Sequence, residues 1–115
     1  MAQFSVDEHF AGRSLMVRSI YDAILEASRR LGPVEEDPKK ISIHLNRRFA
    51  FAGIQTRRDF LILTVKAPGD IESSRIKKRE QASANRWHHE IKITSVPEID
   101  GEIIGWLRKS YEISA

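Results

Sequence analysis

The chain has 115 residues, of which 41% are hydrophobic and 30% are charged, and these proportions exclude a disordered segment and favour an ordinary globular domain. It contains no cysteine, which excludes disulfides, thiol catalysis and thiolate metal sites, and no apolar run approaches the ~18 residues of a membrane-spanning helix. The net charge of +3 is unevenly distributed, because thirteen Lys and Arg accompany five Asp and Glu between Lys39 and Lys92, whereas the flanks are acidic. We therefore expect a soluble cytoplasmic protein, a single domain over residues 1–115, with one positive surface.

The N-terminal third of the chain predicts a helix preceded by a short turn. Ser5–Glu8 has the pattern of a capping box, in which the serine and glutamate side chains bond to free backbone N–H groups. Apolar residues then recur every three or four positions over Ser14–Leu31, which is typical of an amphipathic helix. Gly32 and Pro33 end this helix, and Glu35–Pro38 is expected to be a polar connection.

Alternation of apolar and polar residues predicts four strands in the middle of the chain. The pattern begins at Ile41 and is interrupted by short polar turns, so consecutive strands should pair antiparallel. The stretch between the third and fourth strands, residues 71–86, is polar and favours either a helix over 73–81 or a mobile basic loop. The four predicted strands cover residues 41–46, 49–55, 60–66 and 87–94.

A second helix is predicted at the C-terminus. Ser95–Glu98 has another capping-box pattern, and Ile99, Ile103 and Leu107 recur at helical spacing after it. A helix, four strands and a helix in this order predict a two-layer α+β fold, in which a four-stranded antiparallel sheet has the N-terminal and C-terminal helices packed on one face. The other face of the sheet is then open and polar.

Several stretches of the chain form a series in which order and spacing are informative: His9–Arg13, Ile20–Ala23, Leu31–Pro33, Pro38–Ile43, His89–Ser95, Glu98–Leu107 and Tyr111. Together they resemble the bacterial domain of unknown function numbered 5655. The resemblance covers nearly the whole chain and implies a small α+β domain, but no established activity. Members of that family occur alone or beside other domains, some of them linked to nucleic acids. The residues that match the family's polar pattern are Lys39, Lys40, Arg57, Arg75 and His89.

Basic residues in and around the open sheet face are candidates for binding an anion. Ammonium groups act on phosphates as point charges, and guanidinium groups make bidentate contacts with phosphates or carboxylates. The ordinary alternative is that the same residues are solvated surface positions. The candidates are Lys39 and Lys40 before the first strand, Arg57 and Arg58 at a turn, His44, Lys66, His88 and Lys92 on the strands, and Arg75 and His89 from the family pattern.

His88 and His89 are adjacent on a predicted strand, so their side chains point to opposite faces and cannot easily share one ion. His89 falls on the apolar side, which predicts a histidine at the edge of the core, bonded to a backbone carbonyl. His88 falls on the open face, where His44 could join it as a pair that titrates near neutral pH. Two histidines without a third ligand do not define a metal site, and we predict no metal and no cofactor.

We predict a binding module without catalytic residues, in which a basic face takes a small anionic ligand or nucleic acid and no membrane is contacted. Two alternatives stay open. One is a metal-dependent phosphodiesterase or nuclease, because Glu90 and Lys92 have the Glu-x-Lys form of many such enzymes; it requires an aspartate such as Asp59 or Asp70 beside them. The other is a structural partner domain that forms a homodimer through a strand edge or the open face.

Overall fold

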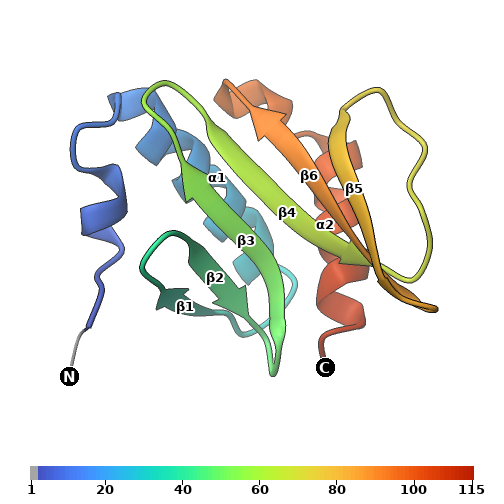
Figure 1. Ribbon diagram of the computed structural model, residues 1–115. Coiled ribbons are helices and arrows are strands. Elements are labelled where there is room, and N and C mark those ends of the chain that lie inside the picture. The colour runs from blue at the N-terminus through green and yellow to red at the C-terminus, as the bar shows by residue number, and fades with distance from the viewer. Residues whose placement is uncertain (1–2) are drawn as a thin grey trace.

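A computed structural model describes residues 3–115 of the chain, which form two layers (Figure 1). Both α-helices lie on one face of a six-stranded antiparallel sheet with the strand order β1-β2-β3-β4-β6-β5. No helix in this described part of the chain is long and apolar enough to cross a membrane. The elements in chain order are η1 (Asp7–Phe10), α1 (Leu15–Arg29), β1 (Glu35–Pro38), β2 (Ile43–Asn46), β3 (Ala50–Thr56), β4 (Leu61–Ala67), β5 (Ile76–Ser83), β6 (Arg86–Ile93), η2 (Val96–Glu98) and α2 (Gly101–Glu112).

The α+β class is confirmed, but the prediction of a four-stranded sheet was wrong, because the sheet has six strands. The predicted strands correspond to β2, β3, β4 and β6. β1, expected as a polar connection, and β5, expected as a helix or a loop, are the two edge strands. An edge strand has one neighbour and buries little, so its sequence need not alternate. In β5 only Ile76 is buried, and β1 consists of three acidic residues and Pro38.

α1 turns its apolar side toward the sheet. Val17, Tyr21 and Ile24 are fully buried, whereas Met16 is 46% exposed, so the buried face begins at Val17. The Tyr21 hydroxyl donates to the Glu36 carboxylate of β1 at 2.6 Å. This bond attaches the edge strand β1 to the helix.

α2 begins after an N-cap rather than at the predicted capping box. The Asp100 side chain accepts a hydrogen bond from the Ile103 N–H at 3.2 Å, which satisfies a free donor of the first turn. The second capping-box pattern starts the short 3₁₀-helix η2, where Glu98 Oε2 accepts from the Ser95 hydroxyl at 2.9 Å. The buried side of α2 consists of Ile103, Leu107, Ser110 and Tyr111.

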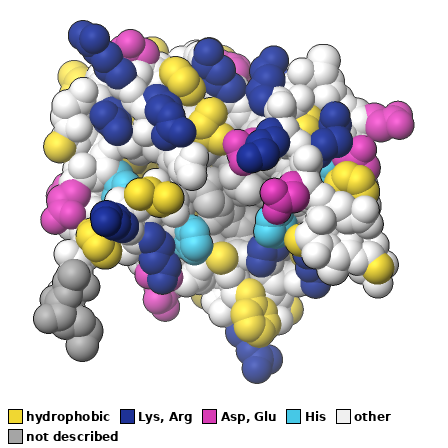
Figure 2. All heavy atoms as spheres, viewed as in Figure 1, with side chains coloured by type: hydrophobic (Ala, Val, Ile, Leu, Met, Phe, Trp, Pro, Cys, Tyr) yellow, Lys and Arg dark blue, Asp and Glu magenta, His cyan; other side chains and the backbone are white. Residues whose placement is uncertain are grey.

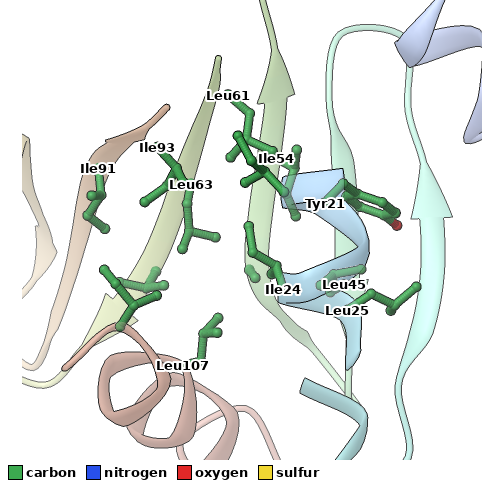
Figure 3. Close-up of a cluster of buried hydrophobic side chains, with 14 of the residues drawn as sticks. Tyr21, Ile24, Leu25, Leu45, Ile54, Leu61, Leu63, Ile91, Ile93 and Leu107 are labelled. Atoms are coloured by element: carbon green, nitrogen blue, oxygen red, sulfur yellow. The ribbon is translucent and has the colours of Figure 1, made fainter. Parts of the chain in front are cut away.

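The core lies between the two helices and the inner face of the sheet. Figure 3 shows Tyr21, Ile24 and Leu25 of α1 and Leu107 of α2 directed toward strand side chains. The strand residues that complete this core are Ile43, Leu45, Phe51, Ala52, Ile54, Leu61, Leu63, Val65, Ile76, Ile91 and Ile93. Successive side chains of a strand point to opposite faces, so the residues between these point to the outer face. Within residues 3–115, no helix covers that outer face (Figure 1).

Candidate anion-binding pocket

The sheet face opposite the helices is hollowed near its centre. Figure 2 views the molecule from this side and shows histidine side chains beside the hollow, with lysine and arginine side chains around it. The hollow is a pocket of about 220 Å³. Its lining comes from β2, β3, β4, β6 and the turn before β2: Ser42, His44, Ala50, Phe51, Ala52, Gly53, Gln55, Thr64, Lys66 and His88.

Gly53 explains why the face is hollow at this point. The register places Gly53 of β3 between His44 of β2 and Thr64 of β4, so side chains flank a position that has none. Ala50, which also lines the pocket, has a small side chain as well. A glycine inside a strand leaves room for a ligand to approach the backbone. The floor of the pocket is therefore formed largely by β3.

A serine of α2 inserts its hydroxyl between β3 and β4 beside the pocket. The Ser110 hydroxyl donates to the Phe51 carbonyl of β3 and accepts from the Lys66 N–H of β4 at 2.9 Å. The ladder between β3 and β4 reaches the pair Ala52–Val65, so the hydroxyl takes the place of the next backbone contact. Lys66 therefore stands where β3 and β4 separate, and it lines the pocket.

Three of the predicted residues meet in this pocket: His44, Lys66 and His88. Lys66 of β4 and His88 of β6 are direct cross-strand partners. His44 of β2 lies on the other side of the gap at Gly53. All three side chains are half-buried. Alternation along each strand indicates that they share a face, and the register between the strands brings them to one volume.

Lys66 and His44 lie in surroundings that disfavour their positively charged forms. Burial, and then the nearby Arg86 guanidinium, lower the pKa of the Lys66 ammonium. Burial, followed by the Lys39 and Lys66 charges, lowers the pKa of the His44 imidazole, and Asp37 opposes this shift. Lys66 forms no ion pair within residues 3–115. An anion in the pocket would stabilise the charged forms of both groups.

Each pocket histidine has a carboxylate on the strand outside it. Asp37 of β1 is the cross-strand partner of His44, and Glu80 of β5 is the partner of His88. Asp37 is itself paired with Lys39 at 3.0 Å, and this contact holds the pKa of its carboxyl below the usual value. Charge on the open face is therefore mixed, with Asp37 and Glu80 on the edge strands, Glu90 on β6 opposite Thr64, and Lys66 on β4.

The other predicted cations of this side lie outside the pocket lining. Lys92 is on the open face of β6, with its Nζ 4.4 Å from the centre of the Phe60 ring. Lys40 is exposed in the turn between β1 and β2, and Arg57 and Arg58 are exposed in the turn between β3 and β4. These four cations surround the face and do not converge on one point.

Arg75 is engaged at the N-terminal end of α2. Its guanidinium pairs with Asp100 at 3.0 Å and with Glu102 at 3.1 Å, and it donates to the Glu98 carbonyl at 2.7 Å. These contacts join the segment before β5 to the helix. Arg75 therefore holds two parts of the chain together and does not belong to the pocket.

His89 points to the helix side of β6, where it is fully buried. Its Nε2 lies 3.0 Å from Asp70 Oδ1 and 3.1 Å from the Ile71 backbone nitrogen, so its partners are a carboxylate and a backbone N–H and not the backbone carbonyl that the sequence suggested. Arg79 Nε donates to the same oxygen at 3.0 Å. The bond from His89, followed by the Arg79 charge, lowers the pKa of Asp70. His89 Nδ1 has no hydrogen-bond partner among the described residues.

The residues of the nuclease alternative are not brought together. Glu90 and Lys92 share the open face of β6, but Asp70 is bonded to His89 on the other face and Asp59 lies in the turn between β3 and β4. Within the described residues 3–115, no group of three or more His, Cys, Asp or Glu side chains is placed to hold a metal ion. Glu90 therefore lacks the neighbouring aspartate that the motif requires.

Ser42, Gln55 and Thr64 also line the pocket, although no pattern in the sequence singles them out. Their hydroxyl and amide groups add hydrogen-bond donors to the basic side chains. The available signal in the sequence is Gly53, because an isolated glycine within a strand pattern indicates a bulge or a close approach. The pocket itself depends on the register between strands, which the pattern of a single strand does not contain.

The fold and the pocket define a class of protein: a small α+β domain in which one face of an antiparallel sheet packs against two helices and the other is open around a polar pocket. The chain belongs to the family described as Domain of unknown function (DUF5655), and the model of that family matches residues 6–114. The resemblance seen in the sequence is thereby confirmed. Comparison with the curated proteins and with the solved structures gave no match.

Proposed function

We propose that the domain is a binding module in which the open-face pocket holds the phosphate group of an anionic ligand. The observation that carries the proposal is the meeting of His44, Lys66 and His88 around the gap at Gly53. Each of three strands contributes one basic side chain to a single volume. Oriented donors around a partly desolvated cation are what a bound anion requires.

The number of donors favours a phosphate over a carboxylate. Lys66 offers three N–H donors, and the two histidines, Ser42, Thr64 and Gln55 add further ring N–H, hydroxyl and amide donors. A carboxylate has two oxygens to accept these bonds. A phosphate monoester has three terminal oxygens and a charge of about −1.5 to −2, so it satisfies more of the donors and more of the positive charge.

The size of the pocket suits one charged group and not a whole ligand. Its volume of about 220 Å³ is below the ~300–1,000 Å³ of pockets that enclose small molecules. The rest of the ligand would extend over the open face, where Lys40, Arg57 and Lys92 are exposed. A small phosphate monoester supplies three terminal oxygens, whereas an internal phosphodiester of a nucleic acid supplies two non-bridging oxygens and one negative charge but can also contact the cations around the face.

Titration calorimetry with inorganic phosphate, and in parallel with a short single-stranded DNA, tests the proposal. We expect saturable binding of phosphate that Lys66→Met weakens at least about tenfold, because a charge-assisted hydrogen bond contributes about 1.5–3 kcal/mol. The matched control is Lys109→Met, since Lys109 is exposed on α2 away from the pocket. Equal affinity in the wild type and in Lys66→Met would contradict the proposal.

The two sources of phosphate are separated by the dependence of affinity on salt. A nucleic acid that contacts several cations of the face releases counterions, so its affinity should fall steeply as salt rises. A small phosphate ester held mainly in the pocket should show a shallow dependence. The ligand that binds more tightly near physiological salt, the nucleic acid or the small phosphate ester, is the one that supplies the phosphate.

A further inference from the structure

We infer that the same pocket can cleave RNA, with His44 as general base, His88 as general acid, and Lys66 stabilising the charge that develops on the phosphate oxygens. The inference rests on the proposed function, because the phosphate at the cleaved bond would occupy the position proposed for the bound phosphate. It adds a chemical step to the binding of that group.

Two imidazoles flank the position proposed for the phosphate. His44 is on β2 and His88 is on β6, with β3 and β4 between them, so their strands lie three spacings of about 4.8 Å apart. The register also displaces His88 by two residues along the strands, because the β6 residue in the same row as His44 is Glu90. Both side chains line one pocket of about 220 Å³, so they enter the same volume from opposite walls. Gly53 adds no side chain to the space between them, and Thr64 and Lys66 of β4 line it. Displacement at phosphorus needs a proton acceptor and a proton donor within reach of opposite sides of the phosphate.

The surroundings of His44 favour the role of proton acceptor. Burial and the charges of Lys39 and Lys66 hold the pKa of the His44 imidazole below the usual value, against the effect of Asp37, so in the free protein this ring favours its neutral form and can accept a proton. His88 faces Lys66 on β4 and Glu80 on β5. His88 takes the donor role, because the reaction needs one acceptor and one donor.

The proposed step is a transesterification within the RNA chain. His44 removes the proton of a ribose 2′-hydroxyl, the 2′-oxygen forms a bond to phosphorus, the bond from phosphorus to the 5′-oxygen breaks, and His88 gives its proton to that leaving oxygen. The products are a 2′,3′-cyclic phosphate and a 5′-hydroxyl end. Proton exchange with water returns both imidazoles to their starting states. The Lys66 ammonium stabilises the negative charge on the non-bridging oxygens in the transition state.

RNA is the class of substrate that fits this set of residues. Its nucleophile is part of the substrate and is held beside the phosphorus, and such an intramolecular arrangement has a high effective concentration. Two positioned imidazoles then supply the proton transfers that this nucleophile and its leaving group need. DNA lacks the 2′-hydroxyl, so it would bind in the pocket without being cleaved.

The test uses the full chain and a labelled DNA oligonucleotide that contains a single ribonucleotide, in a buffer with EDTA. We expect cleavage only on the 3′ side of the ribonucleotide, with a 2′,3′-cyclic phosphate identified by mass spectrometry. His44→Ala and His88→Ala should each lower the rate at least ~100-fold, as expected for loss of a general acid or base. Lys109→Met, purified in parallel, should keep the wild-type rate, since Lys109 is exposed on α2.

Binding measured in the same samples separates this inference from the proposed function. If inorganic phosphate and the all-DNA oligonucleotide bind but the ribonucleotide is not cleaved, the inference is overturned and the proposed function stands. If neither binds, both are overturned. Cleavage at an unchanged rate by a variant that lacks both His44 and His88 would come from a co-purified nuclease and would also overturn the inference. His44→Gln and His88→Gln replace the alanine variants if circular dichroism shows that those do not fold.

Discussion

Lys66 is the residue on which the pocket depends most. Its N–H is held by the Ser110 hydroxyl of α2, and its side chain enters the volume shared with His44 and His88. Burial and the nearby Arg86 lower the pKa of its ammonium, which means that the free protein disfavours the charged form of Lys66. A bound anion reverses this balance, so the same side chain that costs stability in the free protein would contribute affinity in the complex.

The pH dependence of anion binding should follow from the His44 imidazole. Its pKa in the free protein is lowered, and a bound anion favours the charged ring, so binding takes up a proton and affinity rises as pH falls from about 8 to about 6. Sulfate is a suitable probe because it remains a dianion over this range. Calorimetry in buffers of different ionisation enthalpy measures the proton uptake, which His44→Gln should reduce. An affinity that does not change with pH would contradict this expectation.

Ser110→Ala should destabilise the protein although it removes a single oxygen atom. The hydroxyl satisfies the Phe51 carbonyl and the Lys66 N–H, and Ser110 is fully buried, so the substitution leaves two backbone groups without partners. We expect a loss of about 1–3 kcal/mol in the free energy of unfolding, measured by urea denaturation. Ser19→Ala is the control: Ser19 is exposed and its hydroxyl bonds only to the Leu15 carbonyl of its own helix, so its effect should stay within about 0.5 kcal/mol.

At the scale of elements, burial decides which parts of the fold could be predicted. The two helices and the four inner strands each bury one side, and this imposes the periods of three to four and of two that the sequence displays. β5 and β1 are edge strands. Each pairs with one neighbouring strand and needs no apolar face, so its sequence does not alternate. The exposed charges of Lys77 and Lys78 also oppose the pairing of β5 with a second copy.

The candidate site could be predicted in part for the same reason. Alternation identifies His44, Lys66 and His88 as residues of one face, because each lies between two inward-facing neighbours. The three side chains converge because of the register between strands that are distant in sequence, and because the Ser110 hydroxyl lies between β3 and β4. A local sequence pattern contains neither piece of information. Arg75 and His89 are candidates because they match the family's polar pattern, but the segment between β4 and β5 and the start of α2 supply acidic partners for both.

Gly53→Val tests the shape of the pocket without changing its charge. A Cβ at Gly53 would lie 3.7 Å from the Thr64 Cβ, an ordinary contact, and a β-branched residue suits a strand, so the variant should fold with unchanged or higher stability. The valine side chain would fill the gap beside His44, and phosphate affinity should fall at least about tenfold, a loss of about 1.4 kcal/mol. Gly105→Ala in α2, where an added Cβ meets no atom within 4 Å, should leave phosphate binding unchanged. Undiminished binding by Gly53→Val would place the anion elsewhere.

At the scale of the whole molecule, the two sides differ in how their charges are paired. On the helix side, Arg75 and Arg79 are matched by Asp100, Glu102 and Asp70. On the open face, Lys66 has no such partner within residues 3–115. Within this part of the chain, Lys66 is therefore an unpaired cation on a face that also carries the carboxylate of Glu90.

Asp70 should contribute to stability in a manner that depends on pH. Its pKa in the folded protein is lowered from the usual 3.8, first by the bond from His89, so its contribution is present above about pH 4 and is lost as pH falls through the lowered value. Asp70→Asn should therefore lower the melting temperature at pH 7 and have a smaller effect near pH 3, measured by circular dichroism. Asp59→Asn, in an exposed turn, is the control. An equal effect of Asp70→Asn at both pH values would mean that the charge of Asp70 is not involved.

The hydrogen bonds of Ser110 connect the C-terminal helix α2 to Lys66, whose side chain lies on the opposite side of the sheet. The Lys66 amide hydrogen is protected by a side chain of α2, whereas the amides within the β3–β4 ladder are protected by neighbouring strands. Deuterium uptake at Lys66 therefore reports how often the helix lifts away, while uptake within the ladder reports how often the strands part. An occupant that restrains Lys66 from one surface would slow this exchange and make the helix on the other surface more rigid.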